Sequence, residues 1–248
     1  MKRTLIASAL LASALTATAA TPANDTTIVL VHGAFADGSS WDKVIPILQA
    51  KGYKVVAVQN PLTSLADDVT ATQRVVDAQT GKVVLVGHSW GGAVITQAGT
   101  SDKIKALVYV AAFAPSEGEA AGALGKNYAV PPGIATLQAD AAGYLWLPAD
   151  SVAKNFAQDV SPATAALIAA TQGPINSKAF GEATTVAAWK TKPNYYIVAA
   201  NDRMIAPDLE REFAKKLNAT TTTLQSSHVP MVSQPARVAE VILAAAQR

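Results

Sequence analysis

The stretch that decides the fold is Val83-Val84-Leu85-Val86-Gly87-His88-Ser89-Trp90-Gly91-Gly92. An apolar, β-branched run ends in glycine, and an apolar segment typical of a helix follows. The spacing Gly87-x-Ser89-x-Gly91 matches the G-x-S-x-G elbow, in which a serine stands at a sharp strand-to-helix turn. A chance glycine-rich turn is the alternative. The apolar runs on both sides, and the partner residues described below, favour a reactive serine at position 89.

Composition and charge narrow the class of protein. Half of the 248 residues are hydrophobic, 15% are charged, and the formal net charge is +2 without acidic or basic runs. This balance gives no indication of a nucleic-acid-binding surface. The chain contains no cysteine, so it forms no disulfides.

The N-terminus has the pattern of a secretory signal peptide. Met1-Lys2-Arg3 is positively charged, residues 5–15 are apolar, and small residues follow up to Ala20. This order predicts cleavage near Ala19-Ala20, and a periplasmic or secreted chain. The apolar part is too short to span a bilayer, so we expect no membrane association after cleavage. Residues 21–248 should then form a single domain.

Apolar runs and helical patterns alternate along most of this domain, which favours an α/β fold with a mostly parallel sheet and helices on both faces. Strands are expected at residues 26–31, 54–58, 83–86, 104–112, 195–200 and 221–224, and helices at about 41–51, 64–78, 90–98, 207–217 and 235–246. Residues 113–191 break this pattern. They read as a cap inserted before the last strands, with short helices near 149–159 and 162–171. A disordered linker is the alternative, but the aromatic residues of this segment argue against it.

A serine hydroxyl needs a base and the base needs an orienting acid. The chain has three histidines. His32 and His88 lie in glycine turns, whereas His228 follows the last predicted strand and is the expected base. Asp202 follows the preceding strand directly and is the expected acid. Asp208 is its rival, but it stands at a helix start, where N-terminal capping or a dipole contact explains it better.

The oxyanion of a tetrahedral intermediate needs two N–H donors. The backbone N–H of Trp90 should be one, and the loop after the first strand should supply the other. We favour Phe35 over Ala34 as that second donor. We also expect His32, Gly33, Ala34 and Trp146 to border the substrate pocket.

Four groups of residues are shared with a known family: His32-Gly33-x-Phe35 with Trp41, Gly87-His88-Ser89-x-Gly91-Gly92, Asp202 with Ile205 and Pro207, and His228. With these the chain resembles the α/β-hydrolase superfamily, and most closely the small-esterase branch that includes plant methylesterases and hydroxynitrile lyases. The resemblance implies ester hydrolysis without metal or cofactor, through an acyl-enzyme on Ser89. The cyanide-releasing members carry a lysine after the catalytic histidine, but this chain has Val229, which speaks against a lyase. Haloalkane dehalogenases carry an aspartate at the elbow, where this chain has Ser89.

We therefore expect a secreted carboxylesterase for small, fairly apolar esters, acting on a small-molecule substrate. Two alternatives stay open. One is a cofactor-free haloperoxidase-like or C–C-bond-cleaving enzyme of the same fold, and the other is a non-catalytic ligand-binding protein on the same scaffold. The sequence gives no indication of oligomeric state.

Overall fold

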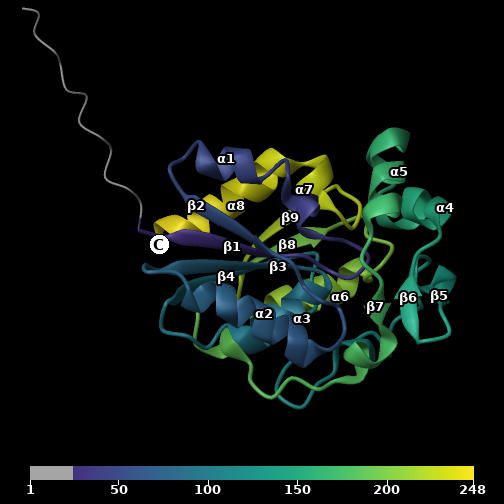
Figure 1. Cartoon of the computed structure of the whole chain (residues 1–248), viewed down its shortest axis with the longest axis horizontal. Coiled ribbons are helices and arrows are strands. Elements are labelled where there is room, and N and C mark those ends of the chain that lie inside the picture. Colours follow the sequence, from purple (N-terminus) through teal and green to yellow (C-terminus); the bar gives the residue numbers. More distant parts are fainter. Residues whose placement is uncertain (1–24) are drawn as a thin grey trace, which may run out of the picture.

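The computed structural model describes residues 25–248. Its centre is a six-stranded, entirely parallel sheet in the order β2-β1-β3-β4-β8-β9 (Figure 1). Its strands are β1 (Thr27–Val31), β2 (Lys54–Val58), β3 (Val83–His88), β4 (Ile104–Val110), β8 (Asn194–Ala199) and β9 (Thr220–Leu224). Every residue of β1, β3 and β8 is buried, as their unbroken apolar character predicts for strands covered on both faces. The expected α/β-hydrolase architecture is therefore present.

Helices cover both faces of the sheet. The helices α1 and α8 lie on one face and α2 and α3 on the other, whereas α6 packs against β8 (Figure 1). The bounds are α1 (Ile45–Gln49), α2 (Leu65–Asp77), α3 (Trp90–Ala98), α6 (Pro207–Lys216), α7 (Pro230–Ser233) and α8 (Pro235–Gln247). The short helix α7, directly after His228, was not predicted.

The first expected helix, 41–51, is shorter than predicted. Asp37 caps a 3-10 turn, η1 (Gly38–Trp41), by accepting the N–H of Ser39, and α1 begins only at Ile45. Pro46 is the reason, because it has no N–H to donate and is tolerated only in the first turn of a helix. By contrast, Ser64 caps α2 as expected, with its hydroxyl accepting the N–H of Asp67 at 3.0 Å.

Residues 113–191 form an ordered cap beside the carboxyl ends of the strands (Figure 1). The expected helices are present as α4 (Ala149–Ser151), which continues into a π-helical turn η4 (Val152–Phe156), and α5 (Pro162–Thr171). A small antiparallel sheet was not predicted. Its strands are β5 (Gln138–Ala139), β6 (Tyr144–Trp146) and β7 (Ile175–Asn176). The remaining cap turns are η2 (Ala121–Ala123), η3 (Ile134–Thr136), η5 (Ser177–Gly181) and η6 (Ala188–Lys190).

The predicted signal peptide lies outside the described residues. Between residues 25 and 248, no helix combines the length and the apolar character needed to cross a bilayer.

Candidate active site

Ser89 stands at the turn between β3 and α3, as the elbow pattern predicts. Its φ is +51° and its ψ is −118°, a conformation that non-glycine residues rarely adopt and that costs about 1–3 kcal/mol. The backbone around it is held firmly. The Ser89 N–H donates to the carbonyl of Val110 at 3.2 Å, and its own carbonyl accepts the N–H groups of Gly92 and Phe113. Ser89 as a whole is 7% exposed, so little of it is open to solvent.

The glycines of the elbow are required by close packing. A Cβ atom on Gly87 would lie 2.5 Å from the carbonyl oxygen of Gly91, and one on Gly91 would lie 2.6 Å from that of Val31. Gly33, in the loop after β1, is equally constrained, because its Cβ would lie 2.7 Å from Cβ of Ser89. These contacts bring the loop after β1 directly against the serine.

Asp202 and His228 meet at the same edge of the sheet. The Nδ1–H of His228 donates to Oδ2 of Asp202 at 2.5 Å, and the two side chains are 1% and 0% exposed. The other oxygen, Oδ1, accepts the backbone N–H groups of Met204 at 2.6 Å and Ile205 at 3.0 Å. The aspartate therefore fixes the tautomer of the imidazole and leaves its Nε2 to exchange a proton.

His88, the residue before the serine, supports the histidine loop. Its Nε2–H donates to the backbone carbonyl of His228 at 2.8 Å, and the two rings lie 4.8 Å apart. Complete burial, together with the nearby His228, lowers the pKa of His88 well below its ordinary value. His88 is thus a neutral residue that fixes the backbone of His228.

Residues 156–159 of the cap contact both the loop that carries Asp202 and the loop that carries His228. The ring of Phe156, the last residue of η4, packs edge-on against His228 at 5.1 Å. Asp159 accepts the backbone N–H of Ser227 at 2.8 Å, and Gln158 donates to the carbonyl of Asn201 at 2.7 Å. The neighbours of the acid and of the base are therefore both bound to residues 156–159.

The N–H groups of Phe35 and Ala34, the two candidates for the second oxyanion donor, differ in their hydrogen bonds. The N–H of Phe35 donates to the cap carbonyl of Gly173 at 3.1 Å and is not free. The N–H of Ala34 donates to no acceptor in the described part of the chain. Trp90 is the first residue of α3, so its N–H has no intrahelical acceptor. Ala34 and Trp90 therefore have N–H groups that an oxyanion could use, whereas that of Phe35, whose φ is +59°, is bound to the cap.

A buried carboxyl group holds the Trp90 side chain. Asp68 of α2 accepts the indole N–H of Trp90 at 2.7 Å and the backbone N–H of Leu62 at 2.8 Å. Burial raises the pKa of Asp68 to about 6, although these two hydrogen bonds partly oppose the shift. Asp68 therefore ties the residue after the serine to the second helix.

His32 shapes the loop that carries Gly33 and Ala34. Its Nδ1 donates to the carbonyl of Gly33 at 2.8 Å, and its Nε2 accepts the backbone N–H of Asn60 at 2.9 Å. Burial lowers the pKa of His32, and both ring nitrogens already have partners. The side chain thus serves the backbone of the loop.

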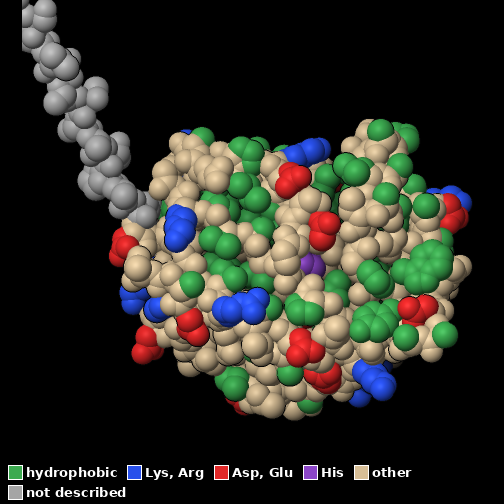
Figure 2. All heavy atoms as spheres, in the orientation of Figure 1, with side chains coloured by type: hydrophobic (Ala, Val, Ile, Leu, Met, Phe, Trp, Pro, Cys, Tyr) green, Lys and Arg blue, Asp and Glu red, His purple; other side chains and the backbone are tan. Residues whose placement is uncertain are grey.

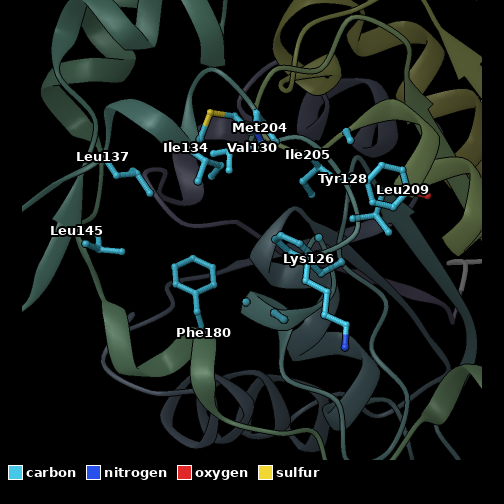
Figure 3. Close-up of a pocket in the computed structure, with 16 residues that line it drawn as sticks. Lys126, Tyr128, Val130, Ile134, Leu137, Leu145, Phe180, Met204, Ile205 and Leu209 are labelled. Carbon is cyan, nitrogen blue, oxygen red and sulfur yellow. The ribbon is translucent and has the colours of Figure 1, made fainter.

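A cavity of about 340 Å³ lies between the cap and the segment that follows Asp202 (Figure 3). Met204, Ile205 and Leu209 form its wall on the side of the sheet, and cap residues form the rest. Phe180 points into its centre, with Leu137 and Leu145 to one side (Figure 3). Phe113, which also lines it, donates its N–H to the carbonyl of Ser89 at 3.1 Å. The walls are mainly apolar, and they adjoin the catalytic loops without including the three catalytic candidates.

The four residues expected to border a pocket do not line this cavity. Gly33, between His32 and Ala34, packs directly against Ser89, and Trp146 lies on β6 with 39% of its surface exposed. Contact of these residues with a substrate stays a prediction.

Three buried or bonded carboxyl groups near the site were not found from the sequence: Asp68, Asp159, and Glu210 of α6, which accepts the backbone N–H of Ala199 at 2.8 Å. For Asp68 and Glu210, the position in the sequence indicates burial. Asp68 shares a helix face with Leu65, Val69 and Val76, and Glu210 shares one with Phe213 and Leu217. A carboxyl group within an apolar stripe is costly unless it is bonded, so its position alone indicates a buried partner. Asp159 follows no such pattern.

Known proteins resemble this chain in sequence and in fold. A curated pyrethroid hydrolase from Sphingobium wenxiniae is 28% identical over 88% of this chain and 86% of its own length. Methylesterase 2 from Arabidopsis thaliana is 26% identical over 88% of this chain and 95% of its own. The crystal structure of a pyrethroid hydrolase from Sphingobium faniae superposes with a TM-score of 0.77, at 24% identity, over 90% of this chain and 98% of that one.

The sequence profile described as "Alpha/beta hydrolase family" matches residues 28–241, from β1 into α8. Its span includes the serine elbow, the Asp202 loop and the His228 loop. The relatives and the fold support a hydrolase with the esterases of this group as its neighbours. The chain belongs to the alpha/beta hydrolase family.

Proposed function

We propose that this protein is a serine carboxylesterase that acts on small, fairly apolar esters through an acyl-enzyme on Ser89. The observation that carries the proposal is the buried 2.5 Å bond between His228 Nδ1 and Asp202 Oδ2, at the edge of the sheet where the strained Ser89 emerges. A histidine held in this tautomer beside an elbow serine is the arrangement that activates a hydroxyl. The names of the pyrethroid hydrolase and the methylesterase among the relatives support the same reaction class.

The reaction would proceed in two halves. Ser89 Oγ attacks the ester carbonyl and its proton passes to Nε2 of His228, while the N–H groups of Ala34 and Trp90 bind the oxyanion. The intermediate collapses, and the leaving alcohol takes the proton from His228. Water then attacks the acyl-enzyme by the same route and releases the carboxylic acid and free Ser89. Asp202 stays ionised throughout and stabilises the imidazolium that forms twice.

The cavity supports the choice of substrate class. Its volume is about 340 Å³, and beside its apolar walls it has Lys126 and Tyr128 as its polar side chains. Such a space suits the apolar part of a small ester, and an anionic or highly polar group would lose its hydration there.

A panel of p-nitrophenyl esters of increasing acyl length tests the proposal, with Ser89→Ala as the matched variant. We expect turnover of short and medium chains by the wild type, and a fall of about 10⁴–10⁶-fold in kcat for the variant. Circular dichroism of the variant should match the wild type. Ligand binding without turnover by the wild type would contradict an esterase.

We also propose that the mature chain is exported, because Lys2-Arg3, an apolar run and small residues precede the folded part. Mass spectrometry of the periplasmic or secreted protein should then show an N-terminus at Ala20 or Thr21. Active protein that retains Met1 and stays in the cytosol would contradict export.

A further inference from the structure

Glu210 carries a fully buried carboxyl group that the packing of the fold does not require. It lies in the first turn of α6, on the face that packs against the sheet, and its exposed fraction is 0%. Glutamate is almost never buried to this extent unless it is paired, so its surroundings require an explanation.

The contacts of Glu210 lead to the catalytic acid. Its Oε2 accepts the backbone N–H of Ala199 at 2.8 Å, and the carbonyl of the same Ala199 accepts the N–H of Asp202 at 3.2 Å. Its Oε1 meets no hydrogen-bond donor in the described part of the chain. Besides burial, the charge of the Asp202 carboxyl, and a side-chain hydrogen bond with it, are among the causes that raise the pKa of Glu210. Two carboxyl groups in such contact repel one another when both are ionised, and they attract when one carries a proton.

The number of donors decides which of the two is protonated. Asp202 accepts three hydrogen bonds, from Met204, Ile205 and His228, whereas Glu210 accepts one. The negative charge is therefore better stabilised on Asp202, and the proton belongs on Glu210. Burial, followed by the charge of Asp202, raises the pKa of Glu210 well above its ordinary value.

The other titratable groups near Glu210 do not change this assignment. Tyr196 of β8 directs its hydroxyl proton to the carbonyl of Ala112, so it does not donate to Glu210. Arg211 is paired with Asp208 at the surface, where Asp208 is 80% exposed. Within residues 25–248, no counter-charge is thus bonded to the Glu210 carboxyl.

We propose that Glu210 is a positioning residue, which in its neutral form donates a hydrogen bond to Asp202 and holds that carboxylate in place behind His228. The role rests on the function proposed above for Asp202 and His228. The bond fixes the orientation of Asp202 and spreads part of its negative charge. Both effects act on His228 through Asp202, since Glu210 itself touches no substrate.

Two substitutions separate this role from a purely structural one. Glu210→Gln keeps an oxygen for the Ala199 N–H and an N–H for Asp202, and it cannot ionise. Glu210→Met keeps the length and removes both bonds. Glu240→Gln is the control, because Glu240 is exposed on α8 and paired only with Arg237.

We expect Glu210→Gln to retain kcat within about threefold and to leave the acid limb of the kcat/KM profile in place. We expect Glu210→Met to lower kcat about 10- to 100-fold with little change in KM. Its acid limb should move to higher pH, because an Asp202 without its donor stabilises the protonated imidazole more strongly. A Gln variant whose acid limb moves to lower pH would show that Glu210 carries a charge, and would overturn the proposal.

An infrared measurement tests the proton without relying on turnover. The wild type minus Glu210→Gln difference spectrum at neutral pH should contain the carbonyl band of a protonated carboxylic acid. The spectrum of Glu240→Gln should lack it. Absence of the band from the wild type minus Glu210→Gln difference spectrum would contradict a neutral Glu210. This test holds even if Glu210→Met fails to fold. Presence of the band in a protein without esterase activity would contradict only the proposed function.

Discussion

The central sheet and the cap differ in the burial of their apolar side chains. The strands β1, β3 and β8 are buried at every position, whereas β5 and β6 of the cap are exposed or half-buried. Among residues 25–248, all five large hydrophobic side chains that are exposed belong to the cap: Val130, Ile134, Trp146, Leu167 and Val186. Figure 2 shows hydrophobic side chains at the surface in the region of β5 and β6.

The sheet and the cap therefore contribute to the active site in different ways. The sheet fixes Ser89, Asp202 and His228 through the backbone at its strand ends, which tolerates little change. The cap forms most of the cavity wall and binds the catalytic loops through single hydrogen bonds such as Asp159 to Ser227. Changes in the sheet loops should therefore affect kcat, and changes in the cap should affect substrate choice and loop order.

The largest effect is expected for the acid at the sheet edge. Asp202→Asn should lower kcat by about 10⁴-fold with a modest change in KM, because the amide cannot hold the reactive tautomer of His228. Asp208→Asn is the matched change six positions later. Asp208 forms an exposed ion pair with Arg211 and does not cap α6, whose N-cap is Ala206. The Asp208→Asn variant should therefore keep its activity and nearly all of its stability. The loss of stability should be smaller than that caused by removing a capping residue.

These kcat values and thermal midpoints should be measured side by side. An inactive Asp208→Asn together with a nearly fully active Asp202→Asn would mean that the acid has been assigned to the wrong residue.

A smaller effect is expected where the cap holds the histidine loop. Asp159→Ala removes the acceptor for the N–H of Ser227 and should lower kcat/KM about tenfold. Asp150→Ala is the control, since Asp150 pairs only with Lys154 on the surface of the cap. Equal activity of both variants would show that the sheet orders the site without help from the cap.

A substitution in the cavity should change substrate specificity without changing the catalytic step. A Cβ on Gly125 would meet only Leu209, at 3.9 Å, so Gly125→Leu should fit and fill part of the space. We expect KM for long acyl chains to rise about fourfold for each methylene excluded, with short esters unaffected. Gly181→Leu, at a position with nothing within 4 Å, is the control. An unchanged chain-length profile for Gly125→Leu would place the substrate elsewhere.

The smallest effect concerns the pH dependence of stability through Asp68. Its pKa is raised to about 6 in the folded protein, so its titration favours the folded state at low pH. This contribution is fully present below the ordinary pKa of aspartate, about 4, and is lost as the pH rises through about 6. The stability advantage of wild type over Asp68→Asn should accordingly shrink between pH 4 and 6. Urea unfolding of both proteins at several pH values checks this, and an advantage that grows over the same range would contradict it.

The sheet could be predicted almost to the residue, and the cap could not. The strand Lys54–Val58 has the bounds expected from the sequence, although it lies at the edge of the sheet and is only partly buried. The cap strands β5 and β7 have two residues each, too few for any periodic signal. The helix α5 was nevertheless predicted, with the bounds that the structure shows.

The same contrast holds within the active site. Ser89, Asp202 and His228 follow from motif and chain order, and the structure brings the acid and the base together. The choice of Phe35 as oxyanion donor stays a prediction, and nothing in the sequence indicated that its N–H is bound by Gly173, a contact between residues 138 positions apart. Asp159 and Gly173 act through tertiary contacts that no local pattern encodes.

The central claim is that Ser89 is the nucleophile, and phosphonate labelling tests it most directly. The protein should be treated with a p-nitrophenyl alkylphosphonate and the modified peptide identified by mass spectrometry, with Ser89→Ala in parallel. The account predicts one phosphonyl group per chain, on Ser89, and none on the variant. A label on another serine, or equal labelling of the variant, would contradict it.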